Sequence, residues 1–92
     1  MDIYIEFSLR VLDKEKEYYI KKDDFVELET TFGKKVKGKV SFIGINYTAY
    51  ENSMMIEITS EDCKMAIKLE NIKSISRYAP NMTIFQNKMA NN

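Results

Sequence analysis

Apolar and polar side chains alternate strictly over the first residues of the chain. The apolar positions are Ile3, Ile5, Phe7, Leu9 and Val11. Similar sets recur at Val36, Gly38, Val40 and Phe42, at Met54, Ile56 and Ile58, and at Met65, Ile67 and Leu69. Because successive side chains of a strand point to opposite faces, a period of two is typical of β-strands. The pattern therefore predicts an all-β fold.

The breaks in this alternation predict where each element begins and ends. We expect strands over residues 2–12, 25–31, 35–45, 54–59, 64–69 and 73–78, with a polar turn at 21–24, a tight turn at 32–34 around a Gly33 of positive φ, a polar loop over 46–53 and one helical turn at 70–72. Residues 8–20 leave an alternative open, because Ser8 can cap a helix that gathers Leu9, Leu12 and Tyr19 on one side. Glycines inside a strand, here Gly38 and Gly44, often mark a bulge or bend. At Gly38 we expect a close backbone approach, in which a Cβ would clash with the closing strand, 73–78.

The same faces predict the hydrophobic core. Its expected members are Val26, Leu28, Val36, Val40, Phe42, Ile56, Ile58, Ile67, Leu69, Ile72 and Ile75. A chain of 92 residues is one domain by length, and we place that domain at 1–80 with a tail at 81–92.

Composition narrows the functional classes. The formal net charge is zero, so no overall field draws the protein to nucleic acid or membrane. Cys63 is the single cysteine, which excludes an intrachain disulfide. Residues 1 and 2 do not begin a secretory signal, and no apolar run is long enough to span a bilayer. We therefore expect a cytoplasmic protein with no membrane contact.

Two segments carry a family resemblance. The first is Gly33-x-x-Val36-x-Gly38-x-Val40, in which a turn glycine precedes a bent strand; the second is residues 67–75, Ile-Lys-Leu-Glu-Asn-Ile-Lys-Ser-Ile. With them, the stretch from Val26 to Ser76 resembles the small five-stranded SH3/Sm-like barrels. The resemblance implies a small SH3/Sm-like β-barrel, sealed by a helical turn and a closing strand. In this chain the barrel would carry an extra N-terminal strand or hairpin.

Within that group the segment from Ile67 to Ser74 is similar to the Rof family, bacterial inhibitors of the Rho transcription terminator. That similarity implies a small regulatory protein of bacterial or phage type. The second Sm motif, with its Arg-Gly pair, is missing, which argues against uridine binding of the Sm kind.

One strand face is basic. Lys35, Lys37 and Lys39 alternate, Lys34 adjoins them, and residues 31–50 contain no acidic side chain. Such a row can follow phosphates, and the aromatic residues Tyr47 and Tyr50 of the next loop can stack on bases. The alternative is a solvated strand face, since edge lysines also discourage strand aggregation, with the two tyrosines capping the core.

The remaining polar clusters predict neither a metal site nor an active site. Asp23, Asp24, Glu27 and Glu29 lack the spacing of a calcium loop, so we expect no metal. The sequence contains no histidine that could activate Cys63, and no carboxylate pair stands out for acid–base work. We therefore expect no enzymatic activity and no cofactor.

Three functional hypotheses follow from these observations. The first is a regulatory binding protein that modulates another macromolecule, most readily through protein–protein contact. The second is an RNA- or DNA-binding module that uses Lys34, Lys35, Lys37, Lys39, Tyr47 and Tyr50. The third is a homo-oligomer that assembles through exposed strand edges. Neutral net charge favours the first over the second.

Overall fold

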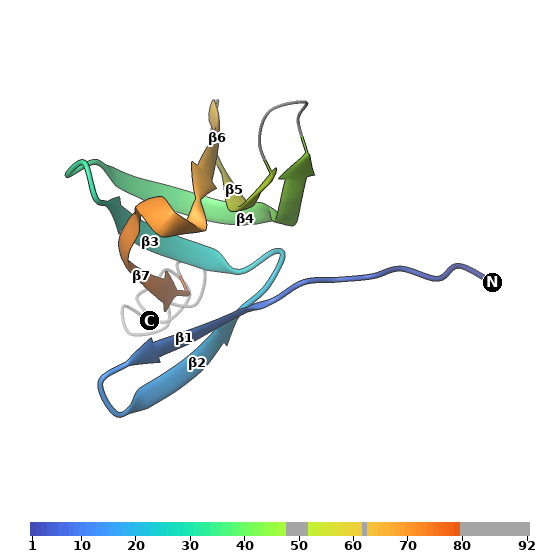
Figure 1. The fold of residues 1–92 in the computed structure, drawn as a ribbon, viewed down its shortest axis with the longest axis horizontal. Helices are drawn as coiled ribbons and strands as arrows, with labels where there is room; N and C mark the ends of the chain where they lie inside the picture. The colour runs from blue at the N-terminus through green and yellow to red at the C-terminus, as the bar shows by residue number, and fades with distance from the viewer. Residues whose placement is uncertain (48–51, 62, 80–92) are drawn as a thin grey trace, which may run out of the picture.

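The computed structural model describes residues 1–47, 52–61 and 63–79, and within these ranges the chain is all-β (Figure 1). Its strands are β1 (Leu9–Asp13), β2 (Lys16–Ile20), β3 (Phe25–Thr30), β4 (Lys35–Tyr47), β5 (Asn52–Ser60), β6 (Cys63–Lys68) and β7 (Ile72–Tyr78). A short 3-10 helix, η1 (Leu69–Asn71), joins β6 to β7. No helix in the described part of the chain is long and apolar enough to cross a membrane.

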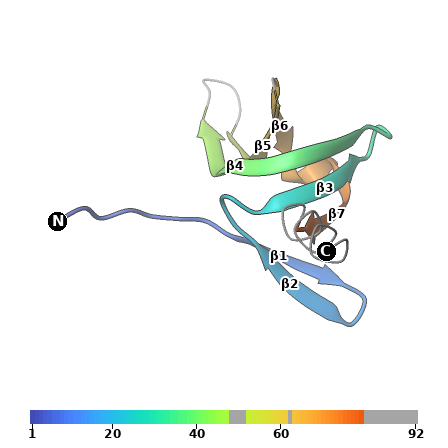
Figure 2. The same cartoon turned by 180° about the vertical axis from the view of Figure 1, so that it is seen from behind.

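The strands form two antiparallel sheets. β1 and β2 make a two-stranded sheet, and the other five follow the order β6-β5-β4-β3-β7. The predicted all-β class is confirmed, and the extra N-terminal element is a hairpin. In both views the hairpin lies beside the β7 end of the larger sheet, and the chain before it runs away from the body (Figures 1 and 2). The predicted tail at 81–92 lies outside the described residues.

The hairpin corrects two predictions for the N-terminus. The predicted strand over 2–12 is wrong in its first half, because β1 begins only at Leu9, opposite Ile20 at the end of β2. The alternative helix from Ser8 is also wrong, since β2 returns directly beside β1 and supplies its hydrogen bonds. Lys14 lies in the turn between β1 and β2 and adopts φ 57°.

The core lies on the inner face of the larger sheet and under the hairpin. Its buried side chains are Ile20, Val26, Leu28, Val40, Ile43, Ile56, Ile58 and Ile67. Six of these were predicted, whereas Ile20 and Ile43 were not. Four further predicted members, Val36, Leu69, Ile72 and Ile75, pack against the core but are only partly buried.

Phe42 is the core prediction that is wrong, because its side chain is 45% exposed. The register between β4 and β5 shifts at Ser41, so that Val40 lies opposite Ile58 but Phe42 lies opposite Glu57. A bulge of one residue moves every later side chain to the other face of the strand. Ile43 is therefore buried where simple alternation predicted Phe42.

The structure confirms the prediction for Gly33 and corrects the one for Gly38. Gly33 has φ 87°, as predicted for the turn between β3 and β4. Gly38 does sit in a close approach, but a Cβ there would lie 2.6 Å from the carbonyl oxygen of Thr59 in β5. The prediction that this neighbour is the closing strand, 73–78, is wrong. The strand that lies against Gly38 is β5, the hydrogen-bonded neighbour of β4.

Candidate functional site

The basic row lies on the outer face of β4. Lys35, Lys37 and Lys39 are all exposed, and their side chains leave the sheet on the side away from the core. The alternation of the strand predicted this shared face, and the structure confirms it.

Acidic side chains of β3 lie directly across from this row. Lys35 is in register with Glu29, and Lys37 is in register with Glu27. Opposite residues of an antiparallel pair hold their Cβ atoms about 4.5–5.5 Å apart, so opposite charges there attract one another. The outer face is therefore a mixed-charge ladder, which sequence reasoning missed because the two rows come from different strands.

The ends of the row have further partners. Lys39 Nζ lies 3.5 Å from a carboxylate oxygen of Asp23. Lys37 Nζ lies 4.6 Å from the centre of the Tyr78 ring, a cation–π distance. Burial, followed by the nearby charge of Glu27, raises the pKa of Tyr78 above its usual value of 10.0. The positive potential that a phosphate would meet is thus reduced along the whole row.

The remaining predicted contact residues lie apart from the row. Lys34 is exposed in the turn before β4, where its backbone N–H donates to Thr30 Oγ1 at 3.1 Å. Tyr47 is 70% exposed at the far end of β4, about 26 Å of strand path from Lys39 at the usual rise per residue. Tyr50 lies outside the described residues. The structure does not bring Tyr47 together with the lysines.

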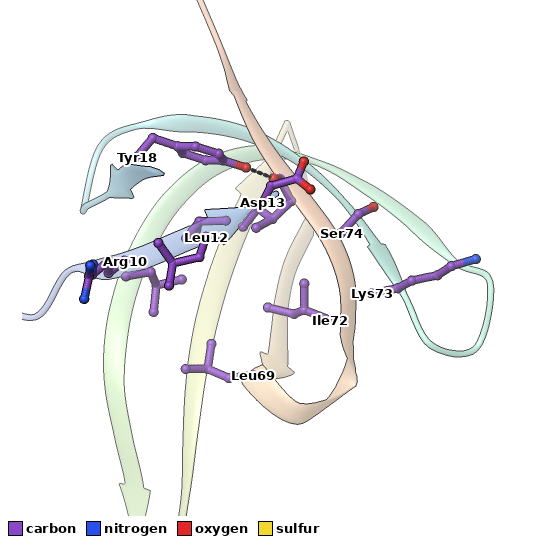
Figure 3. A pocket seen from close by; sticks show the side chains of 11 residues that line it. Arg10, Leu12, Asp13, Tyr18, Leu69, Ile72, Lys73 and Ser74 are labelled. Carbon is purple, nitrogen blue, oxygen red and sulfur yellow. Dashed lines mark hydrogen bonds between the residues drawn. The ribbon is translucent and has the colours of Figure 1, made fainter. Parts of the chain in front are cut away.

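A groove that the sequence did not reveal lies between the hairpin and the η1–β7 segment (Figure 3). Its volume is about 370 Å³. Apolar side chains that pack against the core make its floor: Leu9, Val11, Tyr18, Leu69, Ile72 and Ile75. The groove exists because a two-stranded hairpin meets a larger sheet at one end only, which leaves its apolar face partly uncovered.

The rim of the groove is polar, with one exposed apolar residue. Arg10 and Asp13 contribute from β1, and Lys73 and Ser74 contribute from β7. Leu12 also lines the groove and is 65% exposed. The groove therefore offers apolar surface within reach of charges of both signs.

Three side-chain contacts involve the hairpin that forms one wall of the groove. The hydroxyl of Tyr18 donates a hydrogen bond to the backbone carbonyl of Ile75, which joins β2 to β7 (Figure 3). On the outer face, Arg10 Nε lies 2.6 Å from Glu17 Oε1, which also accepts from the Tyr19 hydroxyl at 3.0 Å. The bond to Arg10 and then that to Tyr19 hold the pKa of Glu17 below its usual value of 4.5. The Tyr18–Ile75 bond thus ties this wall of the groove to the larger sheet.

Chemically reactive groups do not converge in the described ranges. Within residues 1–47, 52–61 and 63–79, no three His, Cys, Asp or Glu side chains are grouped to hold a metal ion. The thiol of Cys63 is exposed at the start of β6, away from the groove. The groove itself offers shape, apolar contact and charge, which are the properties of a binding surface.

Comparison with known proteins adds no family assignment. No protein-family model, no curated protein and no solved structure matches the chain.

Proposed function

We propose that the protein is a non-enzymatic, regulatory binding protein that receives an apolar side chain of a protein partner in the groove between the hairpin and β7. The observation that carries this proposal is the apolar floor within a rim that contains Asp13, Lys73 and Ser74. Protein interfaces commonly centre on an apolar anchor in a pocket with a polar rim around it. Exposed Leu12 extends the apolar surface at the mouth.

The charge distribution supports a protein partner over a nucleic acid. Lys35 and Lys37 face glutamates across the β3–β4 pair, and Lys39 pairs with Asp23. Nucleic-acid affinity depends on neutralising phosphates with uncompensated positive charge. The facing glutamates lower the positive potential that a phosphate would meet, and Lys39 would also have to give up its ion pair with Asp23.

For the architecture, we propose that the larger sheet curls into an SH3/Sm-like barrel. The strand order supports this, since β7 follows the η1 turn and pairs with β3, the first strand of the meander. The close approach of β5 to Gly38 supports a sharply bent β4. The free, exposed thiol of Cys63 fits the cytoplasmic location that we propose.

Selection from a displayed library of random peptides tests the groove even though the partner is not identified. The parent protein should enrich peptides that carry a large apolar residue beside charged ones. Leu12→Asp should lose these peptides, because a carboxylate would sit at the mouth of an apolar floor. Phe42→Asp is the matched control, since Phe42 is also an exposed apolar residue but lies on β4, away from the groove.

Two results would count against this function. Equal peptide binding by the parent and Leu12→Asp would move the binding surface elsewhere. Salt-sensitive RNA retained on the parent, in the absence of any selected peptide, would favour the nucleic-acid module.

A further inference from the structure

The first eight residues form an arm that has strand chemistry but no strand partner among the described residues. Ile3 and Ile5 are 82% and 85% exposed, and Phe7 is 44% exposed. Asp2, Tyr4 and Glu6 occupy the alternate positions. The arm thus has one apolar face and one acidic face, and the side chains of both are exposed.

The hairpin explains why the arm has no partner. β2 ends at Ile20, directly opposite Leu9, so a longer β1 would need a continuation of β2. That continuation turns away, because the side chain of Asp24 accepts from the backbone N–H of Lys21 at 2.9 Å and Asp23 adopts φ 78°. The backbone groups of the arm are therefore left to water or to another chain.

A strand edge to which the arm could add lies at the far edge of the larger sheet. β6 is the terminal strand in the order of the described strands and pairs there only with β5. Along it, Met65 and Ile67 point toward the core, while Lys64 and Ala66 are exposed on the outer face. A terminal strand presents a row of backbone donors and acceptors to which another strand can add.

One antiparallel register matches both faces of the arm to β6. With Tyr4 opposite Ala66, Ile3 lies opposite Ile67, Ile5 opposite Met65 and Phe7 opposite Cys63. In the same register Asp2 lies opposite Lys68 and Glu6 opposite Lys64. A shift by one residue would turn the acidic face toward the core. A shift by two in one direction would set Asp2 against Glu70, and in the other it would carry Glu6 beyond the start of β6.

We propose that the arm of one copy adds as an antiparallel strand to β6 of a second copy, in this register. The second copy is the occupant because the arm continues straight from β1 and runs away from its own larger sheet (Figures 1 and 2). The acidic face of the arm complements the lysines of β6, and a formal net charge of zero leaves no repulsion between copies. This surface is separate from the groove and does not depend on its function.

The proposed contact joins two different surfaces, the arm of one copy and β6 of another. A charge reversal on either surface should therefore weaken self-association. Glu6→Lys and Lys64→Glu should each weaken self-association, roughly threefold to tenfold, because each sets like charges opposite one another. Mixed in equal amounts, the two variants should associate with each other, since each then meets the opposite charge. Ile3→Asp combined with Ile5→Asp should abolish association. Sedimentation equilibrium of the full-length chains measures all of these.

Controls separate this contact from its competitors. Lys22→Glu reverses an exposed lysine in the turn between β2 and β3, outside the lining of the groove, and should leave the mass unchanged. If two arms paired with each other instead, Lys64→Glu would associate like the parent, and that result would overturn the proposal. A parent that stays monomeric up to its solubility limit would overturn it as well.

A cross-link tests the register itself. Phe7→Cys should form an intermolecular disulfide with the exposed Cys63 thiol when diamide is added as the oxidant. Ser8→Cys, on the other face of the arm, should do so much less. Peptide mapping by mass spectrometry identifies which two cysteines are joined. A product that joins Cys63 only to Cys63, at equal yield in both variants, would contradict the register.

Discussion

The hydroxyl of Tyr18 in β2 donates a hydrogen bond to the backbone carbonyl of Ile75 in β7. This bond joins the small sheet to the large one and fixes one wall of the groove. The guanidinium carbon of Arg77 also lies 5.8 Å from the centre of the Tyr18 ring. The position of the hairpin, and with it the shape of the proposed binding surface, therefore depends on a small number of contacts.

Removing that hydroxyl should loosen the hairpin. We expect Tyr18→Phe to lower the free energy of unfolding by about 1 kcal/mol, because a partly buried carbonyl loses its donor. Tyr19→Phe is the matched control, since its hydroxyl donates to the exposed carboxylate of Glu17, and it should change stability by less than about 0.5 kcal/mol. Urea denaturation followed by circular dichroism measures both. Equal losses would mean that the Tyr18 bond contributes nothing specific.

Alkaline pH should destabilise the protein through the same residue. Burial, reinforced by the charge of Asp13, raises the pKa of Tyr18 above its usual value of 10.0. The folded state then favours the protonated phenol, so this contribution is complete below pH 10 and is lost as the pH rises through the higher folded pKa. The free energy of unfolding should fall above pH 10, and less steeply in Tyr18→Phe than in Tyr19→Phe. Identical slopes would remove Tyr18 from the explanation.

Core truncation should have a larger effect. Ile56 is fully buried on β5, and Ile56→Ala should cost about 2–5 kcal/mol, a large part of the stability of so small a domain. Met54 lies two positions earlier on the same strand and is 45% exposed, so Met54→Ala should cost much less. Leu69→Ala should fall between them, because Leu69 is only partly buried. Thermal melts of the three variants test this order.

Periodicity in the sequence predicted the fold correctly where the strands are regular. Alternation placed Val26, Leu28, Ile56 and Ile58 correctly, because regular strands keep side-chain direction over their whole length. It failed at Phe42, because the glycines at 38 and 44 indicate a bulge or bend in this strand but not the residue at which the register shifts. A strand also needs a partner, and alternation in residues 2–8 could not show that β2 turns away.

The candidate site was harder to predict for the same physical reason. The lysine row is a property of one strand, so its shared face could be read directly from the sequence. Its compensation by Glu27 and Glu29 depends on the pairing of two strands, as does the groove between the hairpin and β7. Pairing partners are set by the whole fold, and a single sequence does not state them.

The close approach at Gly38 gives a further stability test. A Cβ there would lie 2.6 Å from a backbone oxygen of Thr59 and 2.8 Å from Ile58 Cγ2, so Gly38→Val should strain β4 against β5 severely. Gly33 has φ 87° and nothing within 4 Å of an added Cβ, so Gly33→Asn should be tolerated better. Chemical denaturation ranks the two. A Gly38→Val protein as stable as the parent would contradict the close contact.

The mixed-charge ladder predicts that the lysine row does not bind nucleic acid strongly. Lys35 and Lys37 face Glu29 and Glu27, so acidic side chains already lower the positive potential along the row. We expect no measurable affinity for single-stranded RNA near physiological salt by fluorescence anisotropy. If the row did follow phosphates, affinity would fall by about 0.7 log units per contact for each tenfold rise in salt.

The register between β3 and β4 also decides which variants can test RNA binding by the lysine row. Reversal of the row to glutamate would set like charges opposite Glu27 and Glu29 and would destabilise the sheet, so loss of binding could reflect loss of fold. Replacing Lys35, Lys37 and Lys39 by glutamine removes the charge without that repulsion. Three exposed lysines elsewhere, Lys16, Lys64 and Lys73, provide the matched glutamine control. Salt-sensitive RNA binding by the parent that the first set removes and the control retains would place the nucleic-acid module ahead of the protein-binding groove.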